Sequence, residues 1–237
     1  KQVVDDLQDL EDRKENRVFY GLSMPSRVGK STVCIFFLAW IACKRPNSHS
    51  AMGGHSGILA KGFYKELLNF IETPEYTFKE LFDYMHPEYA NQAKFPTDKS
   101  SDEFTITLGS PDRFATITCR GIDGTWTGAV DVSKDGYLYV DDLIRDRQHS
   151  LSPTRMEETF QEYLNKMVHR KNDGAKELMV GTLWNVMDPL ERIRKKQDEE
   201  LEKVKEKLKK SLIITIIAVM MAFMMPLILD FGYMITQ

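Results

Sequence analysis

The sequence predicts an α/β fold with a mostly parallel central sheet flanked by helices. Short runs of β-branched and aromatic residues alternate along the chain with longer runs that have apolar residues at helical spacing. This alternation is expected when crossover helices connect parallel strands. The chain has 237 residues, 42% hydrophobic and 28% charged, which is an ordinary globular composition. A domain of this size buries enough surface to fold without disulfides or metals.

The expected elements follow one another in a regular order. The helix at 152–171 is predicted to begin with Ser152 as N-cap and Pro153 at its first position. The polar, glycine-bearing stretch 47–57 and the proline-bearing stretch 86–102 are interpreted as loops. The strands 103–109 and 113–121 are expected to form a hairpin. Strands are predicted at 17–23, 103–109, 113–121, 136–142 and 176–182, and helices at 31–45, 58–72, 152–171 and 188–196.

Charge and cysteine content restrict the class of protein. The net charge of −3 gives no global basic field of the kind that marks many nucleic-acid-binding proteins, although a local basic face is compatible with it. The three cysteines form no C-x-x-C pair, which indicates reduced thiols of a cytosolic protein rather than a disulfide framework or a zinc site. His49 and His55 lie close together in the stretch 47–57. They have no ligand partners at suitable spacing, so they favour a loop over a metal site.

The segment MPSRVGKSTV, residues 24–33, is the strongest indication of chemistry. Gly29, Lys30 and Ser31 form the end of a phosphate-binding loop and lie between an expected strand and an expected buried helix. Met24 stands where the usual pattern has its first glycine. Backbone amides at a helix N-terminus attract phosphate, the lysine binds the β- and γ-phosphates, and the hydroxyl reaches Mg²⁺. The alternative is an N-cap at Ser31 beside a solvated lysine.

Two other strand ends could complete such a site. Asp141 and Asp142 follow four apolar residues, and in a nucleotide-hydrolysing site the first would hold Mg²⁺ while the second polarises water. Taken alone, an aspartate pair at a strand end is more often a turn or cap feature. Gly181 and Thr182 end the strand at 176–182, where a polar residue could sense the γ-phosphate. Without further context, this pair favours a glycine turn with a threonine cap.

The order of these motifs resembles the large terminase subunits of tailed bacteriophages, which are genome-packaging motors. In that family the first glycine of the phosphate loop is frequently absent and an arginine often precedes G-K-[ST], as Arg27 does here. The resemblance covers roughly residues 17–195 and is strongest over 120–193. It is carried by MPSRVGKST and by three further segments in the same order, residues 57–82, 120–147 and 152–193.

The resemblance implies a role for each matching residue. Lys30 would bind phosphate, Arg27 would contact the γ-phosphate and act in catalysis, and Ser31 and Asp141 would hold Mg²⁺. Asp142 would be the catalytic carboxylate, where many relatives use glutamate. Gly181 and Thr182 would couple hydrolysis to movement. The ATP-binding loop would comprise Pro25, Ser26, Arg27, Val28, Gly29, Lys30, Ser31 and Thr32.

The resemblance also implies a function. Residues 1–195 would be a P-loop ATPase domain, incomplete at its N-terminus, that uses ATP and Mg²⁺ to drive double-stranded DNA into a viral procapsid. Such motors act as homo-oligomeric rings with a portal protein and a small terminase subunit in the cytoplasm of the infected bacterium. The family's nuclease domain is missing from this sequence, so DNA cleavage is not expected. Two alternatives stay open: a helicase-like P-loop ATPase, and a non-hydrolysing remnant with a membrane-tethering tail.

The last part of the chain differs from the family pattern. Residues 196–210 are expected to form a charged amphipathic helix or linker. Residues 211–229 carry no charge and are long enough to cross a bilayer. They could be a membrane anchor, a foreign segment fused to a truncated motor, or a core helix of a partner assembly. Their composition favours the membrane interpretation.

Overall fold

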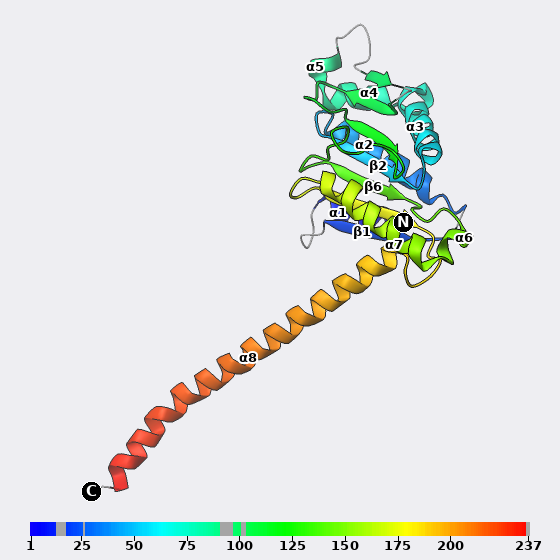
Figure 1. Ribbon diagram of the computed structural model, residues 1–237. Coiled ribbons are helices and arrows are strands. Elements are labelled where there is room, and N and C mark those ends of the chain that lie inside the picture. The colour runs from blue at the N-terminus through cyan, green and yellow to red at the C-terminus, as the bar shows by residue number, and fades with distance from the viewer. Residues whose placement is uncertain (13–17, 26, 91–96, 101–102, 236–237) are drawn as a thin grey trace. The chain divides into compact units, whose positions relative to one another are not determined.

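The structure, a computed structural model, describes residues 1–12, 18–25, 27–90, 97–100 and 103–235 (Figure 1). The side chains of residues 90, 97–99 and 217–235 lie outside that description. The chain divides into two compact units, residues 1–191 and 192–237. The sheet and all the predicted site residues belong to the first unit.

The central sheet confirms the predicted α/β class. Its seven strands run in the order β1-β7-β6-β2-β5-β4-β3. Neighbours from β1 to β5 pair in parallel, whereas β4 and β3 pair antiparallel at one end. The strand β7, which comes last in the sequence, therefore lies between β1 and β6. The strands are β1 (Phe19–Ser23), β2 (Ser50–Gly54), β3 (Thr97–Ser100), β4 (Thr105–Leu108), β5 (Ile117–Gly121), β6 (Tyr137–Asp141) and β7 (Lys176–Gly181).

The helices that follow the strands cover the sheet and bury its apolar side chains (Figure 1). On one face, α2 packs Phe37 against Tyr137 at 5.0 Å between ring centroids, and α3 packs Phe63 against Tyr139 at 5.1 Å. The helices of the first unit are α1 (Gln2–Glu11), α2 (Lys30–Lys44), α3 (Gly57–Glu72), η2 (Pro74–Tyr76), α4 (Phe78–Met85), α5 (Pro87–Ala90), α6 (Arg147–Ser150), α7 (Pro153–Glu162), η3 (Tyr163–Met167) and η4 (Val168–Arg170).

The stretch 47–57 contains a strand, so its interpretation as a loop was wrong. The strand β2 lies in the middle of the sheet and is fully buried. It lacks the β-branched and aromatic residues that mark strands. Side chains of neighbouring elements fill the space that larger residues would occupy. A Cβ on Gly53 would lie 2.7 Å from Met167 Cε, and one on Gly54 would lie 2.7 Å from Leu59 Cδ2. Close packing of neighbours, rather than strand propensity, places small residues here.

Three other segments differ from expectation. The helix α1 was not predicted, although its Leu7 and Leu10 are buried in the core. The stretch 86–102 holds α5 and β3, and its remaining residues 91–96 and 101–102 lie outside the description. The helix at 152–171 begins as predicted, since the Ser152 hydroxyl accepts a hydrogen bond from the Arg155 amide. From Tyr163 onward it becomes π-helical and then 3₁₀-helical.

The long helix α8 (Pro189–Ile235) begins in the first unit and continues through the second. Its exposed charged part carries ion pairs at helical spacing, such as Arg194–Asp198 and Lys210–Glu206. Among the residues described, none of the helices is both long and apolar enough to span a membrane. Most of the apolar stretch 211–229 falls where side chains are not described.

Candidate functional site

In the loop between β1 and α2, two of the described residues have a left-handed backbone conformation. Gly29 is the N-cap of α2 and has φ of 83°, in the left-handed region that glycine adopts without strain. Arg27 also has a positive φ, 64°. The loop is joined to the end of β7, because the Met24 amide donates to the Gly181 carbonyl at 3.2 Å. The start of the loop therefore lies beside the end of β7, which carries the predicted coupling residues Gly181 and Thr182.

Lys30 brings three of the predicted residues together. Its side chain is only 6% exposed, which excludes the alternative of a solvated lysine. Its Nζ donates to Asp142 Oδ1 and to Thr182 Oγ1, each at 2.9 Å. Thr182 in turn donates from its hydroxyl to the Met24 carbonyl at 3.2 Å. The cation thus lies between β6 and β7, at the edge where the carboxyl ends of the strands meet.

Ser31 and Asp141 form a second contact beside the first. The Ser31 hydroxyl donates to Asp141 Oδ2 at 2.9 Å, and Asp141 is 2% exposed. Burial, together with the nearby charge of Asp142, raises the pKa of the Asp141 carboxyl. The other oxygen, Oδ1, is buried without a hydrogen-bond partner among the residues described. The Ser31 hydroxyl and the unsatisfied Oδ1 of Asp141 fit a Mg²⁺ ion that takes few ligands from the protein.

Asp142 has an unusual backbone. Its φ is 39°, a left-handed conformation that is uncommon for a residue other than glycine. Its amide donates to the Val180 carbonyl at 2.9 Å, and its carbonyl lies 3.0 Å from His55 Nδ1. The side chain remains 35% exposed. This conformation directs the carboxylate of Asp142 to Lys30, whereas that of Asp141 reaches Ser31.

His55 is a site residue that the sequence analysis missed. A carbonyl oxygen only accepts hydrogen bonds, so Nδ1 of His55 carries the proton in this contact. His55 directly follows β2, the strand that pairs with β6. Once β2 is recognised, its position predicts that it lies beside the residues after β6. The unrecognised strand was therefore the reason for missing it.

Asp188 was also missed. It lines a small cavity together with Asp142, Thr182 and Leu190. Burial raises the pKa of its carboxyl to about 6, although the Leu190 amide donates to it at 3.1 Å. In the sequence it has the appearance of an N-cap before α8, and nothing there indicates that it faces the same cavity as Asp142.

Other residues of the predicted ATP-binding loop contribute less to this cluster. Ser26 lies outside the described residues. Arg27 is exposed, and Val28 is half-exposed at 49%. Pro25 precedes the turn and Thr32 lies in the first turn of α2. The structure therefore brings together Lys30, Ser31, Asp141, Asp142 and Thr182, and leaves the loop tip open.

Neither protein-family models nor the sequences of curated proteins give a match to this chain.

Proposed function

We propose that the chain is an ATP-hydrolysing motor domain that packages double-stranded DNA into a viral procapsid. The proposal of ATP hydrolysis rests on the position of Lys30 Nζ between Asp142 and Thr182, next to the Ser31–Asp141 contact. A buried lysine at a helix N-terminus, a hydroxyl and two carboxylates are the groups that phosphoryl transfer from Mg-ATP requires. Here they end or follow two strands, β1 and β6, whose carboxyl ends lie at one edge of the sheet.

Each group has a task in hydrolysis. Lys30 exchanges its contact with Asp142 for the β- and γ-phosphate oxygens, and the amides at the start of α2 bind the same phosphates. Ser31 and Asp141 would hold Mg²⁺, which neutralises charge on the phosphates when it is bound. Asp142, released from Lys30, orients the attacking water and accepts its proton. Aspartate is one methylene shorter than glutamate, so this water lies closer to β6.

Thr182 gives the site a means of reporting the state of the nucleotide. Its hydroxyl contacts both Lys30 Nζ and the Met24 carbonyl. When Lys30 moves onto the phosphates, Thr182 loses or changes one of these partners. The hydrogen bond between Lys30 and Thr182 thus links the nucleotide site to the end of β7, and it supports a coupling role for Gly181 and Thr182.

The choice of a packaging motor among P-loop ATPases rests on the terminase-like order of the segments over 17–195. We propose the same partners as for that family: double-stranded DNA, a portal protein, a small terminase subunit and further copies of this chain in a ring, in the infected bacterial cytoplasm. A helicase-like ATPase would instead unwind nucleic acid without any dependence on a portal.

The first test is Mg²⁺-dependent phosphate release by the full chain. We expect Lys30→Ala to lower turnover by about 10²- to 10³-fold, because it removes a charge that stabilises the transition state in a water-poor site. Lys65→Ala changes an exposed lysine of α3 and serves as the matched control, with turnover unchanged. Equal turnover in both variants would contradict an ATPase at this site. Nucleotide binding without turnover in the unaltered chain would favour a non-hydrolysing remnant.

His55 is expected to act on Asp142 as a positioning residue. Its hydrogen bond helps to hold the left-handed backbone of Asp142. His55→Ala should therefore lower kcat about tenfold, the effect of losing one hydrogen bond of roughly 1.4 kcal/mol, and leave KM for ATP nearly unchanged. His55→Asn can donate to the same carbonyl and should restore part of kcat. A change confined to KM, or no rescue by asparagine, would contradict this role.

A further inference from the structure

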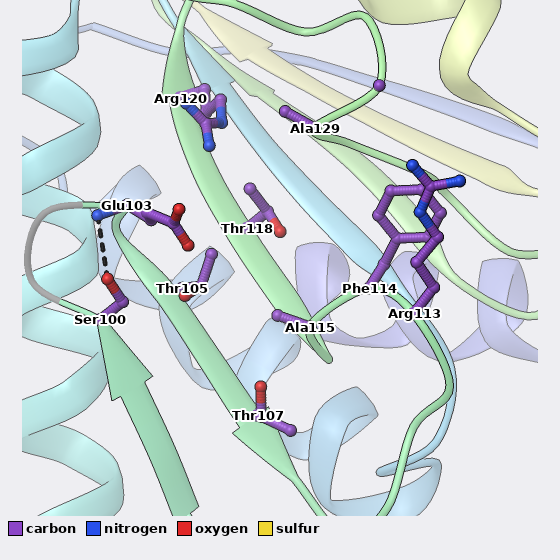
Figure 2. Close-up of a pocket in the computed structure, with 11 residues that line it drawn as sticks. Ser100, Glu103, Thr105, Thr107, Arg113, Phe114, Ala115, Thr118, Arg120 and Ala129 are labelled. Carbon is purple, nitrogen blue, oxygen red and sulfur yellow. Dashed lines mark hydrogen bonds between the residues drawn. The ribbon is translucent and has the colours of Figure 1, made fainter.

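The antiparallel end of the sheet carries an open, polar trough of about 450 Å³. Along β4 and β5, Ile106, Leu108, Ile117 and Cys119 face the core, so the side chains between them face the other way. Figure 2 shows these other side chains as the floor, with walls formed by Ser100 and Glu103 on one side and by Phe114 and Ala129 on the other. The floor residues are Thr105, Thr107, Thr118 and Arg120.

Two guanidinium groups line this trough. Arg113 lies over the ring of Phe114, with 5.2 Å from its Cζ to the ring centroid, and Arg120 rises from β5 (Figure 2). Within the described part of the chain, neither arginine is paired with a carboxylate, and Arg120 Nε is buried without a hydrogen-bond partner. Most buried polar groups are satisfied, so this nitrogen is open to an acceptor that the described residues do not supply.

The chemistry of the lining favours a phosphate ligand. Pockets for small organic ligands are mostly apolar, whereas this one presents two guanidinium groups and the hydroxyls of Ser100, Thr105, Thr107 and Thr118. Arginine, serine and threonine are among the side chains that donate to the phosphates of nucleic acids. Among the described lining residues, Glu103 carries the one carboxylate. Its negative charge opposes a phosphate ligand, so removing that charge should strengthen binding.

The trough is separate from the nucleotide site but connected to it through the sheet. Arg120 lies opposite Gly53 of β2, and the next residue of β2, Gly54, lies opposite Asp141. A ligand held on Arg120 is thus joined to the Asp141 strand by two adjacent strand pairings.

We propose that this trough binds the phosphodiester backbone of a nucleic acid through Arg113, Arg120 and the hydroxyls of its floor. The choice of duplex DNA as the nucleic acid rests on the proposed function. The choice of a phosphate ligand rests on the lining alone.

The test is the binding of a short fluorescent DNA duplex to the full chain without nucleotide, measured by anisotropy over a range of KCl concentrations. Arg120→Gln and Arg113→Gln should each weaken binding about tenfold and each lower the slope of log K against log salt by about 0.9. Glu103→Gln, at an exposed position, should strengthen binding. Arg155→Gln removes an exposed arginine of α7 and is the matched control, with affinity unchanged.

Several outcomes would overturn the proposal. One is equal duplex affinity in all four variants. Another is a loss in Arg155→Gln as large as that in Arg120→Gln. A third is binding of inorganic phosphate, lost in Arg120→Gln, without any binding of the duplex, since that would assign the trough to a small anion. Thermal unfolding of each variant, together with the exposed Glu103→Gln change, separates a binding effect from misfolding. Because no nucleotide is present, a failure of ATP hydrolysis leaves this result unaffected.

Discussion

Asp142→Asn is expected to lower ATP turnover by about 10²- to 10⁴-fold, the contribution that a positioned general base makes. Asparagine keeps the shape of the side chain but cannot accept the proton of the attacking water. It also tolerates the left-handed backbone at φ 39°, so the loop after β6 should keep its conformation. The measurement is steady-state phosphate release compared with single-turnover hydrolysis.

The affinity for ATP should not fall in Asp142→Asn, in contrast to the turnover. Asp142 holds Lys30 in the structure, and its negative charge lies where the γ-phosphate would approach. Removing that charge should leave ATP affinity equal or higher, as measured by equilibrium binding of a fluorescent ATP analogue. The control for both measurements is Asp173→Asn, which changes an exposed aspartate in the turn before β7. Full turnover in Asp142→Asn would exclude Asp142 as the base and would point to another carboxylate of the site, such as Asp188.

Much of the site could be predicted because its signals are local in the sequence. The Gly29-Lys30-Ser31 segment sits between a recognisable strand and a buried helix, and Asp141 and Asp142 follow a clear apolar strand. Parallel strands place their carboxyl ends at one edge, so the meeting of these groups follows from the fold class. The pairing of β7 between β1 and β6 then explains why Thr182, rather than a more distant residue, contacts Lys30.

The missed parts depend on tertiary packing. The strand β2 ends in two glycines because Met167, Trp126 and Leu59 occupy the space where their side chains would lie. No hydrophobic period marks it, and His55 at its end was therefore interpreted as part of a loop. The polar trough was not predicted from the sequence for a related reason. Its threonines alternate with core residues as in any half-exposed strand, and only the fold shows that Arg113 and Arg120 share one cavity with them.

The other large effect concerns stability and involves Glu11 of α1. Its carboxylate is 1% exposed and joins α1 to α2, β6 and β7. Oε1 accepts from Lys44 Nζ at 2.9 Å and from Arg45 at 2.7 Å. Oε2 accepts from Arg45, Lys176 and Tyr137, and the Lys176 ammonium is itself only 2% exposed. Glu11→Gln is expected to destabilise the fold by about 3–5 kcal/mol, because it removes the negative charge that the buried Lys176 ammonium contacts.

The same contact predicts how stability depends on pH. Burial would raise the pKa of Glu11, but the hydrogen bonds from Arg45, Lys44, Lys176 and Tyr137 outweigh it and hold the pKa far below the ordinary value of 4.5. In acid the unfolded chain therefore binds a proton at Glu11 that the folded chain does not. The contribution of Glu11 is complete well above pH 4.5 and declines as the pH falls through and below that value. Urea unfolding should show the difference between the unaltered chain and Glu11→Gln shrinking as the pH is lowered through this window.

A double variant identifies the origin of the loss. If the cost of Glu11→Gln comes from the lost ion pair between Glu11 and Lys176, then Glu11→Leu combined with Lys176→Met should recover much of the stability, since apolar replacements of a buried ion pair are often tolerated. Lys44 and Arg45 remain partly exposed, so water can solvate them in that variant. Glu66→Gln, on the exposed side of α3, should have no effect and serves as the control. A double variant as unstable as Glu11→Gln would instead assign the loss to the packing of α1, because then the position of the helix, and not the charge, would determine the stability.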